Sequence, residues 1–372
     1  MKAGHKVTVI TGYYDIGGLE NISKHQIIDG IEVFVVGTKY SNKMNFSKRV
    51  FSFLSFIFYS FFIGLKQKDI DVIYATSTPL TIGIPAVFLK FFKRVPFVFE
   101  VRDQWPEVPI QLGIIKNPVF IKFLLLLERI IYRFSDSIVA LSSGMAEGIR
   151  NVIGENKPIS VMPNCSDLDI FRPDVDGCKV REKHKWENKF ILIHFGAIGK
   201  ANGLDFLIDA AEKLKTVNDI HFVVIGDGSE RERLICAAAE LKLVNIEFLK
   251  SVPKKELPQY IAAADVSLVV VANYPILEHN SANKFFDSLA AGKPILLNYS
   301  GWQRAILESH KAGLGCRLYN IEEFIDNVLY LREHPAELRI MGQNARRLAE
   351  ERFGRNLLAQ KVLKLLEFYG NR

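Results

Sequence analysis

The stretch Ser281–Gln303, SANKFFDSLAAGKPILLNYSGWQ, predicts a buried helix that turns tightly into a buried strand. Gly292 and Pro294 end the apolar, small-residue run of the helix, and the strand ILLN follows at once. A helix that leads into a fully apolar strand is the repeating unit of a parallel sheet covered on both faces. Two opposite charges, Lys284 and Asp287, interrupt this helix three residues apart. They are either an exposed ion pair of about 0.2–0.5 kcal/mol or two groups that reach one ligand.

The same alternation extends over the whole chain, whose 372 residues suit two domains. Strand-like apolar runs lie at 5–11, 71–77, 96–103, 137–142 and 159–164, and again at 190–197, 221–228, 246–250, 266–271 and 293–298. Two such series predict an α/β protein of two doubly wound, Rossmann-like domains that face a cleft. We place the domains at 1–170 and 189–352, with a linker at 171–188. A C-terminal helix at 353–372 packs back on the first domain or stays on the second.

The chain opens on KAGHKVTVIT, residues 2–11, which has the pattern of a helix end, a capping Gly4 and a strand. A doubly wound domain normally has a strand, a loop and that helix before this point. We therefore expect the first domain to lack its first strand and loop.

The formal net charge of +7 lies mainly in residues 1–165, which hold 19 Lys and Arg against 13 Asp and Glu. There is no arginine-rich run interleaved with aromatic residues, so nucleic acid is not an expected partner. A basic first half suits an anionic membrane surface or a phosphorylated substrate, or is a solvated surface without a partner. The four cysteines form no CxxC pair and no signal peptide opens the chain, which favours a cytoplasmic location.

Segment Val50–Leu65, VFSFLSFIFYSFFIGL, is uncharged and crowded with aromatic residues, with Lys or Arg on both sides. It is shorter than the roughly 20 residues that span a bilayer, so we expect it to lie in the interface of an anionic membrane. The alternative is a helix buried in the first domain. A second apolar run at 120–134 has charges at helical spacing and is expected to be a core helix.

Two glycine turns follow strands of the second domain. In HFGAIGKANG, Gly196 and Gly199 let a ligand approach the backbone, the next helix offers free N–H groups, and Lys200 adds a cation. VVIGDGSERERL repeats the arrangement with Gly226 and Gly228. Either turn alone is common in such folds, whereas the two together favour a nucleotide that carries phosphates. No GxxxxGK[ST] motif occurs, so ATP hydrolysis is not expected.

The motifs AGHKVTVIT, VRDQWPE, VMPNCSDLDIFRP, HFGAIGKANGL, VVIGDGSERERL and SANKFFDSLAAGKPILL together resemble bacterial nucleotide-sugar glycosyltransferases of the GT-B fold. The likeness is to the retaining branch called family 4 or group 1, of the surface-polysaccharide type, and it covers nearly the whole chain. It implies that Asp287 holds the ribose of the donor and that Lys284 and Lys200 face its diphosphate. Gly196 and Gly199 would let that diphosphate approach the backbone.

The resemblance also implies roles on both sides of the reaction centre. Ser281, Ala282 and Asn283 would line the turn that meets the donor sugar through backbone N–H groups. Asp103, at a strand end of the first domain, would be the catalytic or acceptor-binding group, with Glu107 second. A structural carboxylate is the alternative reading of Asp103.

The sequence departs from the family pattern at three places. The first of the family's paired glutamates falls on His279, with Glu278 one position away. Ala197 and Asn202 stand where many relatives carry Arg and Lys. The glycine-rich loop that follows the first strand in relatives has no counterpart.

Three DxD pairs, at 69–71, 167–169 and 174–176, have the composition of a metal-binding motif. They lie in connections or just before a strand, so we expect solvated carboxylates and neither a metal nor another cofactor. Lys284, Lys200 and helix N-termini would then stabilise the leaving diphosphate.

The sequence and the resemblance together predict a metal-independent, retaining glycosyltransferase of the hexosyltransferase type. It would move a sugar from a UDP-sugar to a lipid-linked saccharide of a bacterial surface polysaccharide, namely O-antigen, capsule or exopolysaccharide. It would act at the inner face of the membrane. Two alternatives stay open: a catalytically inactive binding or scaffold protein with the same fold, and a nucleotide-sugar epimerase.

Overall fold

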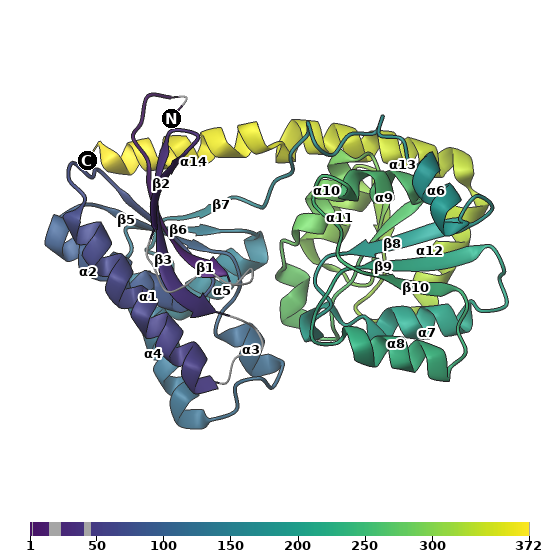
Figure 1. Cartoon of the computed structure of the whole chain (residues 1–372), viewed down its shortest axis with the longest axis horizontal. Helices are drawn as coiled ribbons and strands as arrows, with labels where there is room; N and C mark the ends of the chain where they lie inside the picture. The colour runs from purple at the N-terminus through teal and green to yellow at the C-terminus, as the bar shows by residue number, and fades with distance from the viewer. Residues whose placement is uncertain (2, 15–23, 41–45, 372) are drawn as a thin grey trace.

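The computed structural model describes residues 1, 3–14, 24–40 and 46–371, which form two lobes (Figure 1). Each lobe contains parallel strands with helices packed around them, so the expected pair of Rossmann-like domains is confirmed. Within the described ranges, no helix is both long enough and apolar enough to cross a membrane.

The second lobe contains one six-stranded parallel sheet in the order β10-β9-β8-β11-β12-β13. Its strands are β8 (Phe190–Phe195), β9 (Ile220–Ile225), β10 (Ile246–Leu249), β11 (Val266–Val269), β12 (Ile295–Leu297) and β13 (Gly313–Gly315). Each face of the sheet has its own buried cluster, one containing Phe285 and the other Phe206. The sequence predicted every strand of this sheet except β13, because glycine is depleted in strands.

Helices cover both faces of this sheet. They are α6 (Cys178–His184), η2 (Lys200–Asn202), α7 (Asp205–Lys213), α8 (Arg231–Glu240), α9 (Leu257–Ala263), η3 (Pro275–His279), α10 (Asn283–Ala290), α11 (Gly301–Ser309), α12 (Ile321–Glu333) and α13 (Pro335–Leu348). The helix predicted from the opening stretch is α10, which packs Phe285 and Phe286 fully into the core. That packing leaves the polar groups of its first turn near the carboxyl end of β8.

The first lobe differs from the single parallel sheet that the sequence predicted. The described strands form a parallel sheet in the order β4-β5-β6-β7 and a separate sheet in the order β1-β3-β2. They are β1 (Thr8–Tyr14), β2 (Lys24–Ile28), β3 (Ile31–Tyr40), β4 (Ile73–Thr76), β5 (Phe97–Val101), β6 (Ser137–Ala140) and β7 (Ile159–Val161). β2 runs antiparallel to β3 through a turn at Asp29 and Gly30, which both have positive φ. An Asp-Gly pair between apolar runs is a hairpin signal, so this strand pair was readable from the sequence.

The helices of the first lobe are α1 (Phe46–Lys66), η1 (Leu80–Ile82), α2 (Gly83–Lys93), α3 (Glu107–Gln111), α4 (Pro118–Phe134) and α5 (Ser143–Ile153). The expectation of a core helix is only partly right for α4. Leu124 and Ile131 are buried, but Val119 and Phe123 are exposed. The charges at helical spacing misled the prediction because Glu128 lies on the buried side while apolar side chains face outward.

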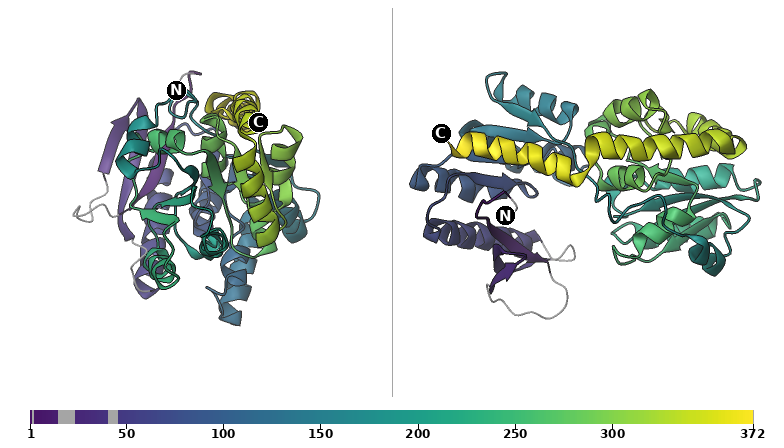
Figure 2. Two further views of the ribbon diagram at one scale, coloured as in Figure 1. Left: turned by 90° about the vertical axis from the view of Figure 1, so that its right-hand side faces the viewer. Right: turned by 90° about the horizontal axis from the view of Figure 1, so that it is seen from above.

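The C-terminal helix α14 (Arg355–Gly370) connects the two lobes (Figure 1, Figure 2). It follows α13 and a π-helical turn at Ala349–Phe353, and it runs from the second lobe along the first. Tyr369, near its end, is buried with Val98 of β5 and Val139 of β6. The helix therefore packs its last turns on the first lobe.

Candidate functional site

Lys284 and Asp287 lie in the first turns of α10, and in the described part of the chain neither forms an ion pair. The exposed i,i+3 pair is thus not what the structure contains. Both side chains are largely buried, and they contact different neighbours. The two groups therefore have separate partners and do not neutralise each other.

Lys284 reaches across to the loop that follows β8. Its Nζ lies 3.0 Å from Nε2 of His194 and donates to Oδ1 of Asn202 at 3.2 Å. A Cβ added to Gly196 would lie 3.5 Å from Cε of Lys284, so the lysine stem borders this glycine. Burial lowers the pKa of Lys284 to about 7. The ammonium is consequently poised to gain stability from an anion beside Gly196.

His194 is the buried residue whose imidazole contacts the ammonium of Lys284. Burial, and after it the charge of Lys284, holds the pKa of His194 well below its usual range. The imidazole is therefore neutral, and its Nε2 accepts from the lysine. Its Nδ1 has no hydrogen-bond partner among the described residues. The sequence indicated a core histidine here, and this position is buried, but its contact with Lys284 had no sequence signal.

Asp287 faces the segment that joins the two lobes. Its Oδ1 accepts a hydrogen bond of 3.1 Å from Oγ of Ser166. Burial raises the pKa of Asp287 to about 6, while the Ser166 bond and the charge of Lys254 act in the opposite direction. The carboxylate keeps acceptor capacity for further donors such as sugar hydroxyls.

The start of α10 adds backbone donors to this pair. Its N-cap residue, Ala282, offers no side-chain cap, and the exposed Asn283 begins the helix. The first N–H groups of a helix have no partner within it and carry the positive end of its dipole. Lys284 and this helix end together form a place for an anion, with Asp287 one turn further on.

The two glycine turns have different roles. A Cβ on Gly226 would lie 1.8 Å from the carbonyl oxygen of Gly196, and one on Gly228 would lie 2.2 Å from that of Ile198. These glycines are therefore required for packing of one turn against the other. In contrast, a Cβ on Gly199 would meet nothing closer than Asn202 Nδ2 at 4.0 Å. Only the first turn leaves its glycine backbone open to a ligand.

Lys200 lies in η2, directly after the open glycine turn, and is exposed. Among the described residues its ammonium has no hydrogen-bond or ion-pair partner. It therefore remains available to a ligand at the first turn. The structure does not bring it into contact with Lys284, whose partner from this loop is Asn202.

Ser281 connects the donor-side turn to the first lobe. Its Oγ accepts from the backbone N–H of Asn164 at 3.2 Å, and its carbonyl accepts from Nδ2 of Asn164 at 2.6 Å. Arg102 in turn donates to Oδ1 of Asn164 at 3.2 Å. The motif VMPNCSDLDIFRP thus supplies Asn164 and Ser166, which hold the start of α10 against the first lobe. Their role could not be read from the sequence without the fold.

Asp103 and Glu107 follow β5 in the first lobe. Asp103 is exposed and accepts a 2.7 Å hydrogen bond from Oγ1 of Thr78. Glu107 begins α3 and accepts from Nε2 of Gln111 at 2.9 Å. Asp103 is adjacent to Arg102, so it lies next to the contact between the lobes, whereas the Glu107 bond lies within its own helix.

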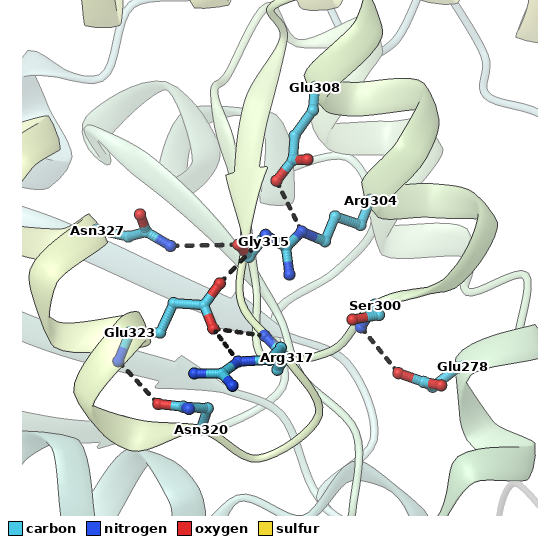
Figure 3. Close-up of polar contacts among 9 residues, drawn as sticks. All are labelled: Glu278, Ser300, Arg304, Glu308, Gly315, Arg317, Asn320, Glu323 and Asn327. Atoms are coloured by element: carbon cyan, nitrogen blue, oxygen red, sulfur yellow. Dashed lines mark hydrogen bonds and ion pairs between the residues drawn. The ribbon is translucent and has the colours of Figure 1, made fainter.

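His279 and Glu278 occupy the place of the family's first glutamate. A Cβ on Gly144 would lie 1.9 Å from Nδ1 of His279, and Ser142 donates to the His279 carbonyl at 2.7 Å, so α5 packs directly on this residue. Figure 3 shows the Glu278 carboxylate directed at the N–H of Ser300, 2.9 Å away. Glu278 therefore holds the start of α11 and does not replace the displaced carboxylate.

The loop carboxylates of two DxD pairs have protein partners. Asp167 forms an ion pair with Arg355 at 2.6 Å. Asp174 accepts both guanidinium bonds of Arg172 at 2.9 Å, and Asp176 accepts from the N–H of Cys178. These contacts give the carboxylates of Asp167, Asp174 and Asp176 a structural function in the connection between the lobes.

Comparisons with known proteins cover both lobes. The family model described as glycosyl transferases group 1 matches residues 178–348, and the model described as glycosyl transferase 4-like domain matches residues 1–165. No curated protein sequence matches the chain.

Solved structures share the fold at low identity. Sucrose-phosphate synthase from Thermosynechococcus elongatus has a TM-score of 0.78 at 15% identity, over 98% of this chain and 89% of that chain. HepE from Anabaena in complex with UDP-glucose has a TM-score of 0.71 at 18% identity, over 91% of this chain and 86% of that chain. A glycosyltransferase from Rickettsia africae has a TM-score of 0.71 at 15% identity, over 98% of each chain.

Proposed function

Because its halves match the group 1 and 4-like glycosyltransferase domains, the chain is a glycosyltransferase of the GT-B fold, and we propose that it uses a UDP-sugar as donor. The observation that carries this proposal is the pair of unneutralised groups at the start of α10. Lys284 would contact the diphosphate and Asp287 the ribose hydroxyls. Uridine is favoured because the similar HepE structure contains UDP-glucose.

The diphosphate would lie between α10 and the open glycine turn. Gly196 borders the Lys284 stem, Gly199 has open space, and Lys200 is exposed beside them. Each group supplies what a phosphate needs: close backbone approach, free N–H donors and a cation. Because Lys284 is already buried next to His194, exclusion of water would strengthen the attraction between its ammonium and the diphosphate.

Transfer breaks the bond between the anomeric carbon and the diphosphate oxygen, and the electron pair leaves with UDP. Lys284, Lys200 and the α10 N-terminus would stabilise that negative charge, in place of a metal ion. The new bond forms between the anomeric carbon and an acceptor hydroxyl oxygen, and the hydroxyl proton would pass to the carboxylate of Asp103. We assign the acceptor side to the exposed Asp103, which Thr78 orients at 2.7 Å. The resemblance favours retention of the anomeric configuration.

The acceptor would be a lipid-linked saccharide, because the first lobe carries an extended apolar surface. We call it the aromatic face, formed by exposed Phe51, Leu54, Phe58 and Phe62 of α1, Phe88, Phe91 and Phe92 of α2, and Val119, Phe123 and Leu126 of α4. Ring contacts make it continuous: Phe61 meets Phe92 at 5.6 Å, and Phe91 meets Phe134 at 5.3 Å between ring centroids. Large contiguous apolar surfaces mark sites of association with membranes or proteins.

Charge distribution favours an anionic lipid surface as the partner. The sequences of α1, α2 and α4 contain several Lys and Arg but a single carboxylate, Glu128, and that residue is buried. Lys66, Arg94, Arg129 and Arg133 are exposed at the borders of the aromatic face. Aromatic side chains flanked by cations suit insertion at headgroup level. This arrangement supports a peripheral location at the inner face of a bacterial membrane and a role in surface polysaccharide assembly.

A second candidate is a binding protein without catalysis. His279 stands where the family's first glutamate is expected, and the carboxylate of Glu278 accepts a hydrogen bond from the N–H of Ser300. Such a protein would bind UDP but not cleave UDP-sugars.

Release of UDP separates these possibilities. The purified chain is incubated with UDP-glucose, UDP-galactose or UDP-N-acetylglucosamine, with and without lipids extracted from bacterial membranes. We expect lipid-dependent UDP release from one donor, which is lost in Lys284→Ala. UDP binding without release from any donor would favour the binding protein, and a new sugar epimer without release would indicate an epimerase.

A further inference from the structure

Three residues form a continuous series of hydrogen bonds across the boundary between the lobes. Arg102, directly after β5, donates from Nη2 to Oδ1 of Asn164 at 3.2 Å. Asn164 follows β7 and donates from Nδ2 to the carbonyl of Ser281 at 2.6 Å. The backbone N–H of Asn164 also donates to Oγ of Ser281 at 3.2 Å. We call Arg102, Asn164 and Ser281 the interlobe network.

The first-lobe end of the network is held by the parallel sheet. The N–H of Arg102 donates to Oγ of Ser77 at 3.0 Å. Met162, two residues before Asn164, donates to the carbonyl of Ala140 in β6 at 2.8 Å. Arg102 and Asn164 therefore leave the sheet beside positions that are still bonded to neighbouring strands.

The partners of the Asn164 side chain determine the orientation of its amide. A guanidinium has only donors, so Oδ1 of Asn164 must face Arg102. Nδ2 then faces the carbonyl of Ser281, which can only accept. In the reversed orientation, two donors would meet at Arg102 and two acceptors would meet at Ser281. Arg102 thus determines which group Asn164 presents to Ser281, and its charge strengthens their bond.

At the other end of the network, Ser281 restrains the turn that begins α10. Ser281 is buried, and its N–H donates to Oδ1 of Asn280 at 2.7 Å. The N–H of Phe285 donates to the carbonyl of Ala282 at 3.1 Å and closes the first turn of the helix. The free N–H groups of this turn consequently point in the direction that the bonds to Ser281 set.

The two charged groups of α10 have partners outside the network. Lys284 donates to Asn202, and Asp287 accepts from Ser166. A shift of Ser281 would therefore displace the turn before α10 while these two groups keep their own hydrogen bonds. The part of the donor at that turn would be affected more than the parts at Lys284 and Asp287.

The acceptor side is attached to the same part of the sheet. Asp103 follows Arg102 in the chain, and Thr78, which donates to Asp103 at 2.7 Å, follows Ser77. Ser77 holds the backbone of Arg102 and Thr78 holds the carboxylate of Asp103. The interlobe network thus connects the place of Asp103 with the turn at Ser281.

We propose that Arg102 and Asn164 are positioning residues for sugar transfer. Asn164 holds the turn at Ser281 so that the donor sugar meets the acceptor at Asp103, and Arg102 acts only through Asn164. This role rests on the proposed function, since the turn belongs to the proposed donor site. A misplacement of about 1 Å can cost about 100-fold in rate, so bonds that do not touch the substrate can control kcat.

Kinetics of Asn164→Ala test this role. We expect kcat for UDP release, with a donor that the unchanged protein turns over, to fall by about 10- to 100-fold. The affinity for UDP should change by less than about threefold, because Lys284 and Asp287 keep their partners. A loss of UDP affinity as large as the loss of kcat would overturn the proposal.

Two further variants keep this test decisive. Asn164→Asp retains an acceptor for Arg102 but places an oxygen against the carbonyl of Ser281, so it should lose kcat as Asn164→Ala does. Asn245→Ala is the matched control, because the buried Asn245 also donates to a backbone carbonyl, that of Ala211 at 2.8 Å. This control should lower the melting temperature but not kcat. Equal loss of kcat in the control and in the Asn164 variants would overturn the proposal.

A double-mutant cycle tests whether Arg102 acts through Asn164. Arg102→Met should lower kcat in the unchanged protein and have no further effect in Asn164→Ala. The same fold loss in both backgrounds would mean that Arg102 contacts a ligand directly, which would overturn the proposal.

Residue-resolved hydrogen exchange of the ligand-free protein tests the network without any donor. The amides of Ser281 and Phe285 should exchange about 5- to 10-fold faster in Asn164→Ala and in Arg102→Met, and at an unchanged rate in Asn245→Ala. Unchanged exchange in all three variants would overturn the proposal. If the unchanged protein does not bind UDP or does not release it from a donor, the proposed function fails, and the exchange rates alone decide the role of the network.

Discussion

Lys284 has a lowered pKa because its ammonium is buried, and this couples ligand binding to protonation. Burial lowers its pKa to about 7. A diphosphate beside the ammonium would favour the charged form and raise that pKa. Above pH 7 the free side chain is mostly neutral, whereas the bound one is charged. Binding should therefore take up a proton.

We expect UDP binding at pH 8 to take up nearly one proton more per site in the unchanged protein than in Lys284→Arg. The measurement is calorimetry in two buffers of different ionisation enthalpy, since the difference in observed heat counts the protons. Lys284→Arg is the matched control, because arginine stays protonated at pH 8. The same uptake in Lys284→Arg would show that another group titrates.

Burial has the opposite effect on the pKa of Asp287, which it raises. Its pKa of about 6 in the folded protein exceeds that of an exposed aspartate, so the folded state binds more protons between about pH 4 and pH 6. Its contribution to stability is present below that window and is lost as the pH rises through it. At pH 8 the protein therefore holds a buried carboxylate that, among the residues the structure describes, Ser166 alone stabilises by a side-chain hydrogen bond.

Asp287→Asn should raise the free energy of unfolding at pH 8, by up to about 3 kcal/mol, and weaken UDP binding by about 10- to 100-fold. Thermal melts of the variant and the unchanged protein at pH 8 and pH 4.5 check the sign, because the difference between them should shrink at the lower pH. A variant that is less stable at pH 8 and still binds UDP would refute this assignment.

At this scale the sequence predicted the important pair but not its surroundings. Lys284 and Asp287 stand out as charges in an apolar helix, so their type and spacing could be read directly. His194, Asn164 and Ser166 come from distant segments, and only the folded chain brings them to α10. The sequence also treated all four turn glycines alike, although two of them serve loop packing.

Among the elements, the glycine turns allow packing and binding to be separated. Gly226→Ala places a Cβ 1.8 Å from a backbone oxygen, so the turn must move, which costs about 1–3 kcal/mol. Gly199→Ala has open space, so stability should be unchanged while UDP affinity falls. Chemical denaturation and UDP titration of both variants provide the comparison. Equal loss of stability would mean that both turns are structural.

The aromatic face should bind membranes through α1, α2 and α4. Replacing Phe51, Phe58 and Phe62 by Ser should release the protein from vesicles of phosphatidylglycerol and phosphatidylcholine without lowering its melting temperature. These side chains are 72%, 59% and 43% exposed, so little core packing is lost. Val244→Ser, at an 81% exposed apolar residue of the second lobe, is the control. Unchanged sedimentation with vesicles would rule out this face.

Across the whole molecule, the alternation of apolar strands and helices predicted the two-lobe fold because each lobe repeats one unit. The first lobe was harder to predict. Its β2–β3 hairpin, which the Asp29-Gly30 pair signals locally, breaks the alternation. The parallel pairing of β1 with β3 depends on long-range contacts that no local pattern encodes. The contact between the lobes, from Asn164 to Ser281 and from Ser166 to Asp287, likewise follows only from the fold.

The most direct test of the account is calorimetric titration of UDP into the protein and into Lys284→Ala and Asp287→Asn, with a thermal melt of each sample. The account predicts one UDP site per chain, and affinity that falls at least about 10-fold in each variant while both still melt cooperatively. UDP binding of equal affinity in all three proteins would place the donor elsewhere and contradict the assignment of α10.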